Sequence, residues 1–195
     1  MPLPRRELFE RIAFAGPSDQ VRGTAFFPLV DEVTQRCPAE ARALALTPRF
    51  GRLALQPLHF YPAADWLVLL WDACDALEGQ LGVDGAMARL GEVTARQILA
   101  SLLGRLVGTR AQPLHPLDRL AQAPAVYGTS VTFGARTVEQ IDDRHARMRF
   151  ERELIPAGFH AAAVRALIGD GGYPVEVWPH VTGLLELTLE VARAD

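Results

Sequence analysis

The stretch HARMRFEREL, residues 145–154, decides the fold class, because its apolar residues stand at every second position over most of its length. One face carries Ala146, Met148, Phe150 and Leu154, and the other carries Arg147, Arg149, Glu151 and Glu153. Successive side chains of a strand point to opposite faces, so this period predicts a strand with one buried and one solvated face.

The sequence on both sides of this strand predicts a small sheet. Residues 129–141, TSVTFGARTVEQI, predict a partner strand joined to it by a turn at 142–144. Residues 156–172 predict a helix that begins at a proline and ends at a run of glycines. Residues 173–181 and 184–191 predict two further strands. The order is therefore β-β-α-β-β, with antiparallel pairing across the short turns.

The first two-thirds of the chain predict helices, at about 28–36, 38–46, 62–79 and 84–108. Three of them begin beside a proline, a residue favoured in the first helical turn: Pro28, Pro38 and Pro62. Gly79 is the predicted end of the third helix. Gly91 and Gly104 lower helix propensity in the fourth, which predicts close contact with a neighbouring helix.

These elements predict an α+β fold in a single domain, residues 1–195, with a helical part at about 1–124 and a sheet-containing part at about 125–195. The net charge of −3 gives no basic surface for nucleic acid. The longest apolar run, WLVLLW, is too short to span a bilayer, and charged residues stand where a signal peptide has its apolar core. We therefore expect a cytoplasmic protein that binds neither nucleic acid nor membrane.

The sequence carries no catalytic motif. No pair of histidines has HxxxH or HxH spacing; the five are His59, His115, His145, His160 and His180. No serine stands in a GxSxG elbow, and the GDGG run at 169–172 follows a helix, whereas a phosphate-binding loop opens one. Cys37 and Cys74 lack CxxC spacing and are expected to be reduced and buried. We expect no catalytic residue, metal or cofactor, and hence no enzyme.

A helical layer packed on one face of a small sheet can leave an apolar cavity between the layers. The apolar faces of the predicted elements supply candidate lining residues. We predict that a small apolar ligand contacts Trp66, Leu70, Cys74, Phe150, Phe159 and His160. His115 is expected instead to cap or pack the beginning of a helix.

Three stretches together resemble a family of paralogous, uncharacterised proteins known from myxobacteria. They are VRGTAFFPLVDEV at 21–33, ARLGEVTARQILASLLGRLVG at 88–108 and IPAGFHAAAVRALIGDGGYPVEVWPHVTGLLELTLEV at 155–191. More remotely, the layout resembles the superfamily of heme-nitric-oxide-binding domains, vinyl-reductase-type domains and TRAPP vesicle-tethering subunits. That resemblance implies a cavity between the layers, a dimer, and binding in place of catalysis.

The heme-binding pattern is broken at the residues that matter. In heme-nitric-oxide-binding domains the iron-ligating histidine follows a segment that residues 117–120, LDRL, resemble, but Ala121 stands in its place. The tyrosine-x-serine-x-arginine motif for the heme carboxylates is also missing, because Tyr127 and Ser130 have the wrong spacing. The resemblance therefore implies the fold without the heme.

The leading hypothesis is a non-enzymatic binding or sensory module, homodimeric, that holds a small apolar ligand or presents that surface to a protein partner. The alternative is a TRAPP-like adaptor or scaffold. Two further hypotheses are an enzyme with a site assembled from scattered residues such as Cys74, Asp118 or His160, and a heme-based sensor.

Overall fold

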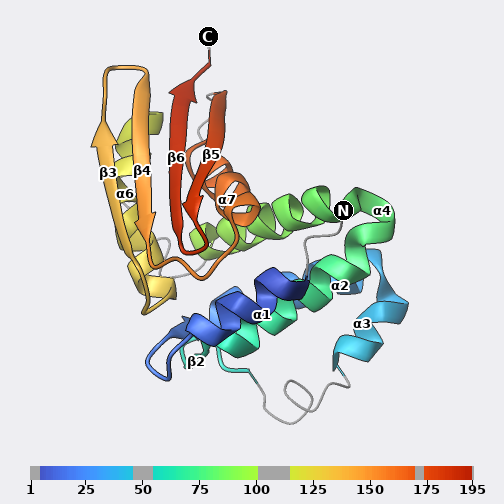
Figure 1. Cartoon of the computed structure of the whole chain (residues 1–195). Helices are drawn as coiled ribbons and strands as arrows, with labels where there is room; N and C mark the ends of the chain where they lie inside the picture. Colours follow the sequence, from blue (N-terminus) through green and yellow to red (C-terminus); the bar gives the residue numbers. More distant parts are fainter. Residues whose placement is uncertain (1–4, 46–54, 101–114, 170–173, 195) are drawn as a thin grey trace.

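The computed structural model of the chain describes residues 5–45, 55–100, 115–169 and 174–194. Figure 1 shows a sheet at one end of the molecule and a group of helices at the other. The long helix α4 connects the two ends, because its first half lies among the N-terminal helices and its second half runs beside α7 at the sheet.

Three of the N-terminal helices begin where the prolines predict them, whereas the helix at 5–14 and the 3₁₀ helix at 23–25 were not predicted. The helical elements of this part are α1 (Arg5–Phe14), the short 3₁₀ helix η1 (Gly23–Ala25), α2 (Phe27–Arg36), α3 (Pro38–Ala45) and α4 (Ala63–Ala100). Pro28 stands in the first turn of α2, where its missing N–H leaves no hydrogen bond unmade. Two three-residue strands, β1 (Gln20–Arg22) and β2 (Phe60–Pro62), pair antiparallel and were not predicted, since three residues are too few for a period.

Helix α4 reverses direction at Gly82, which has φ 68° and ψ 167°. The predicted break between two helices is present, but the prediction of Gly79 as the end of the first was wrong, because Gly79 remains helical. A positive φ strains any residue with a side chain, so the sharp turn falls on a glycine. Gly104 and the predicted end of the second half lie outside the described residues.

The sheet confirms the predicted α+β class and the β-β-α-β-β order. Its elements are α6 (Pro116–Ser130), β3 (Ala135–Gln140), β4 (His145–Glu151), α7 (Ala157–Gly169), β5 (Val175–Gly183) and β6 (Glu186–Arg193). The strands pair antiparallel in the order β3-β4-β6-β5. Ala146, Met148 and Phe150 are buried as predicted, and they pack with residues of α6 and α7 on the covered face. The other face is polar, with Arg147 bonded to Glu190 at 2.7 Å.

Two predictions around β4 were wrong. The partner strand begins at Ala135 and not at Thr129, because residues 129–130 still belong to α6. Glu153 was placed on the solvated face, but it is 1% exposed. The strand ends at Glu151, and Arg152 takes a positive φ of 50°, which ends the alternation and turns Glu153 inward.

Helices α4 and α7 cross at Gly91, which confirms the close contact predicted there. A Cβ atom on Gly91 would stand 2.2 Å from the backbone oxygen of Phe159. The absence of a side chain therefore sets the distance between the two helices.

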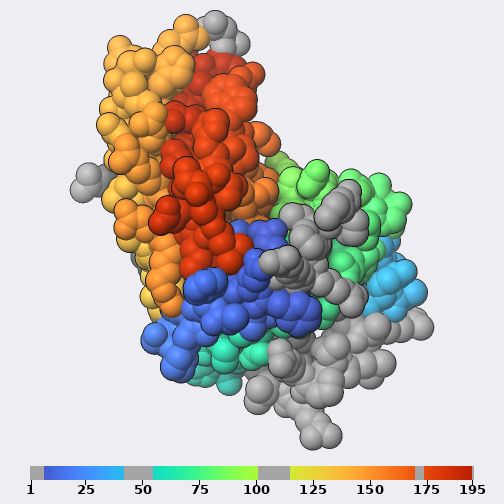
Figure 2. Space-filling view, viewed as in Figure 1, coloured from blue at the N-terminus to red at the C-terminus, as the bar shows by residue number. Residues whose placement is uncertain are grey.

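Helix α1 is anchored to the sheet-containing part of the chain. Arg11 is buried, and its Nη1 donates to the backbone oxygen of Glu153 at 3.0 Å. In Figure 2 the N-terminal segment, in blue, packs against the base of the sheet, in red and orange. No helix within the described ranges is long and apolar enough to cross a membrane.

Candidate ligand-binding cavity

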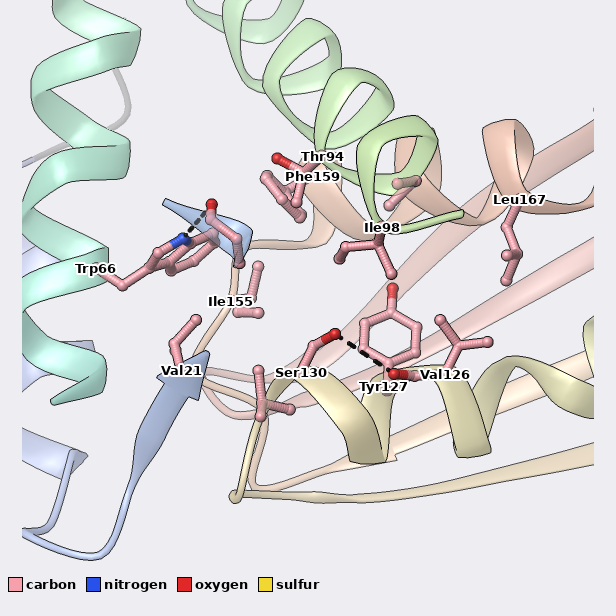
Figure 3. A pocket seen from close by; sticks show the side chains of 14 residues that line it. Val21, Trp66, Thr94, Ile98, Val126, Tyr127, Ser130, Ile155, Phe159 and Leu167 are labelled. Atoms are coloured by element: carbon pink, nitrogen blue, oxygen red, sulfur yellow. Dashed lines mark hydrogen bonds between the residues drawn. The ribbon is translucent and has the colours of Figure 1, made fainter. Parts of the chain in front are cut away.

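An apolar cavity of about 50 Å³ lies where α4, α6 and α7 meet. Figure 3 shows side chains from these helices and from the β1 region converging on it. Its fourteen lining residues are Val21, Ala25, Trp66, Thr94, Ala95, Ile98, Val126, Tyr127, Ser130, Val131, Ile155, Phe159, Ala163 and Leu167. A water-sized sphere needs about 10–15 Å³ by this measure, so the cavity has room for roughly three to five heavy atoms.

Helical periodicity explains why these side chains share one space. Phe159, Ala163 and Leu167 follow one another at intervals of four in α7, and residues four apart lie on the same helix face. Thr94 and Ile98 repeat this spacing in α4. Each helix therefore turns one apolar stripe toward the cavity.

Trp66 forms the end of the cavity toward the N-terminal helices. Its indole Nε1 donates to the backbone oxygen of Ala25 at 3.0 Å. Its ring meets that of Phe159 edge to face, with centroids 5.4 Å apart. The hydrogen bond satisfies the only polar atom of the side chain, so Trp66 presents an apolar surface to the cavity.

The other polar side chains in the wall differ in how they are satisfied. Ser130 Oγ donates to the backbone oxygen of Val126 at 3.4 Å (Figure 3). The hydroxyl of Tyr127 pairs with a ring nitrogen of His160. Thr94 Oγ1 is buried and has no hydrogen-bond partner within the described part of the chain.

Behind Tyr127 lies a buried chain of polar side chains. Tyr127 Oη stands 2.8 Å from His160 Nδ1, and His160 Nε2 stands 3.3 Å from Glu153 Oε1. Glu153 also forms an ion pair with Arg136 and accepts the backbone N–H of Ile155 at 3.0 Å. This chain joins α6, α7, β3 and the β4–α7 connection.

The environment fixes the protonation states of this chain. Burial lowers the pKa of His160 below its usual 6.5, despite the opposing effect of Glu153, so the imidazole is neutral at pH 7. Burial acts to raise the pKa of Glu153, but the Arg136 guanidinium and the Ile155 N–H stabilise the carboxylate, and the net shift is downward. Because His160 is neutral, Arg136 supplies the countercharge for the ionised carboxylate.

Tyr127 completes the chain as a proton donor. Burial raises the pKa of its phenol, so the hydroxyl keeps its proton. The neutral imidazole of His160 then turns Nε2–H toward the carboxylate of Glu153 and accepts the Tyr127 hydroxyl at Nδ1.

Two of the six predicted ligand-contact residues, Trp66 and Phe159, line the cavity. Phe150 and His160 lie one layer behind, with ring centroids 5.8 and 5.3 Å from that of Tyr127. The other two, Leu70 and Cys74, belong to the core around the first half of α4, with Cys74 Sγ 4.0 Å from Met87 Sδ.

Sequence reasoning missed Thr94, Ile98 and the contribution of Tyr127 to a binding surface. The spacing of Thr94 and Ile98 was a usable signal, since a threonine one turn before an isoleucine places a hydroxyl on an apolar stripe. Of the residues suggested for a scattered enzyme site, Asp118 is exposed on α6, while Cys74 and His160 belong to different buried clusters.

His115 caps α6, as predicted for the beginning of a helix. It is the N-cap residue, and its Nδ1 accepts the backbone N–H of Leu117 at 3.4 Å. The capping contact gives this histidine, which stands between two prolines in the sequence, a structural role.

The fold is similar to that of H-NOX proteins. One from S. oneidensis in the Fe(II)NO ligation state superposes with a TM-score of 0.71 at 8% identity, covering 89% of this chain and 99% of that one. The Fe(II) unliganded H-NOX protein from K. algicida gives 0.68 at 13% identity, with 89% and 97% covered. The IWP-051-bound H-NOX from Shewanella woodyi gives 0.66 at 10% identity, with 88% and 94% covered. At these identities the likeness is one of fold.

The fold is thus that of an H-NOX-like α+β domain. No curated protein sequence matches the chain. The chain belongs to the family described as "Protein of unknown function (DUF2378)", whose model matches residues 15–192. The resemblance to heme-nitric-oxide-binding domains is confirmed for the fold, and those to vinyl-reductase-type domains and TRAPP subunits stay predictions.

The residues present do not fit a heme. Ala121, at the position of the expected iron ligand, is exposed on α6 and offers no ligating atom. His160 is the only buried histidine of the five, and its ring nitrogens already face Tyr127 and Glu153. The cavity is also several times smaller than the 300 Å³ or more of typical cofactor pockets. The described residues bring together no group of three His, Cys, Asp or Glu side chains.

Proposed function

We propose that this protein is a non-enzymatic sensory module that holds a small apolar ligand, without heme, in the cavity between α4, α6 and α7. The supporting observation is the cavity itself, whose walls are apolar side chains drawn from four separate segments of the chain. A ligand there touches both the helical part and the helices that cover the sheet. Filling an apolar cavity adds contacts that the empty protein lacks.

The cavity is placed so that its occupancy can be transmitted. Tyr127 forms part of the wall and also begins the buried chain through His160 and Glu153. Glu153 in turn pairs with Arg136 of β3, and its backbone oxygen accepts from Arg11 of α1. A ligand that favours one position of Tyr127 therefore shifts the balance between two arrangements of these elements.

Xenon, an apolar probe of suitable size, tests the proposal. We expect backbone and indole NMR signals of Trp66, Phe159 and Ala163 to shift and saturate as xenon pressure rises. Ala163→Leu places three more carbon atoms in the cavity and should abolish these shifts while the fold persists. Ala125→Leu makes the same change on the exposed face of α6 and should leave binding intact.

Absence of saturable shifts in the wild-type protein would overturn the proposal, as would undiminished xenon binding by Ala163→Leu. In that event the TRAPP-like adaptor becomes the leading hypothesis. The homodimer and the protein partner stay predictions, and sedimentation velocity on the purified chain tests the dimer directly.

A further inference from the structure

Thr94 is the unsatisfied polar group of the cavity. Its side chain comes from the second half of α4, the residue is 3% exposed, and Oγ1 has no hydrogen-bond partner among the residues described. Figure 3 shows it beside Phe159, on the α4 side of the space. A buried hydroxyl without a partner is costly and rare in folded proteins, so each case needs an explanation.

The same molecule shows how a helical threonine satisfies itself in the usual way. Thr34 in α2 donates its hydroxyl to the backbone oxygen of Val30, four residues earlier, at 2.7 Å. Ser130 in α6 makes the equivalent bond to Val126. The residue four positions before Thr94 also belongs to α4, but the Thr94 hydroxyl does not bond to its backbone oxygen. Its hydroxyl is therefore free to serve a group inside the cavity.

Water alone is a poor partner for this hydroxyl. A buried water needs two to four polar neighbours to be held well. Among the polar atoms of the cavity wall, Thr94 Oγ1 alone lacks a partner within the described residues, because Tyr127, Ser130 and Trp66 are already hydrogen-bonded. An amphiphilic molecule suits these walls better, because its carbon atoms fill the apolar space while one oxygen pairs with Thr94.

We infer that the ligand of this cavity is a short-chain alcohol, with about three to five heavy atoms, whose hydroxyl pairs with Thr94 Oγ1. This inference rests on the proposed function and refines it, because the ligand is no longer wholly apolar but carries one hydroxyl for Thr94 Oγ1. The size follows from the cavity volume of about 50 Å³. The single oxygen follows from the single unsatisfied group.

The test compares 2-propanol with isobutane, which has a methyl group in place of the hydroxyl and the same number of heavy atoms. NMR titration of the full chain gives the Kd of each, isobutane being applied under pressure. In Thr94→Val, which keeps the shape and removes the hydroxyl, we expect 2-propanol to bind about five- to tenfold more weakly and isobutane to bind unchanged. Thr94→Ser keeps the hydroxyl and should keep the preference for the alcohol.

Thr34→Val is the matched control, because it makes the same chemical change on α2, away from the cavity, and should alter neither Kd. If isobutane and xenon bind but 2-propanol does not, or if Thr94→Val binds 2-propanol as well as the wild type does, the alcohol assignment falls and the cavity proposal stands. If none of the three molecules binds, the proposed function itself falls.

Discussion

Replacing Gly91 with alanine should drive α4 and α7 apart. The new Cβ would stand 2.2 Å from the backbone oxygen of Phe159, whereas ordinary contact begins at 3.4 Å, so the helices must separate by about 1.2 Å. Backbone atoms cannot rotate away as a side chain can, so we take the upper part of the usual overpacking cost, about 3 kcal/mol. Alanine returns about 1 kcal/mol of helix propensity. The net loss in the free energy of unfolding is about 2 kcal/mol.

Urea denaturation followed by circular dichroism measures this loss, and thermal unfolding should show Tm falling by about 4–8 °C. Gly79→Ala is the control in the same helix, because no atom lies within 4 Å of its added Cβ. That variant should gain about 1 kcal/mol, the reverse sign for the same substitution. Gly91→Ala with wild-type stability, or both variants changing in the same direction, would refute the packing argument.

Three further predictions concern ionisable groups. Burial raises the pKa of the Cys74 thiol to about 12, so in a Cys37→Ala background Ellman's reagent should label it only as the protein unfolds. Burial holds the pKa of His160 below 6.5, so between pH 6.5 and 5 the unfolded chain binds a proton that the folded protein excludes. The free energy of unfolding should therefore fall as the pH drops from 6.5 to 5. Urea titrations measure this slope, and His160→Gln should remove it. The hydrogen bonds from Arg152 lower the pKa of Asp19 below 3.8, a stabilisation that is present above pH 3.8 and lost as the pH falls further. Because the Arg152 side chain is half exposed, Arg152→Ala should cost about 1 kcal/mol at pH 7 and flatten this acid loss in the same titrations.

Local signals in the sequence were sufficient for most helices and for the sheet. The alternation in β4 and the prolines at helix beginnings act over a few residues, and the structure follows them. The break in α4 shows their limit. Gly79 and Gly82 are equally able to adopt a positive φ, and packing between distant segments selects Gly82.

The cavity was less predictable than the fold, because no sequence period encodes it. The apolar faces of the predicted helices correctly indicated Trp66 and Phe159 as residues that line the cavity. The same criterion also indicated Leu70, which lies in the core. Whether an apolar residue lines the cavity or lies in the core depends on how α4 bends and where α7 crosses it. Thr94 becomes informative only once its missing hydrogen bond is seen, and a lone threonine in a helix carries no such sign in the sequence.

The anchoring of Arg11 has a consequence for synthesis on the ribosome. Helix α1 is made before the backbone oxygen that Arg11 binds, because that oxygen belongs to Glu153, 142 residues later. At translation rates of about 5–20 residues per second, α1 waits roughly 7–28 seconds for that acceptor. During this interval the arginine and the apolar residues beside it stay hydrated or are held by chaperones. Helix α1 thus reaches its final place only after a much later segment of the chain has been made.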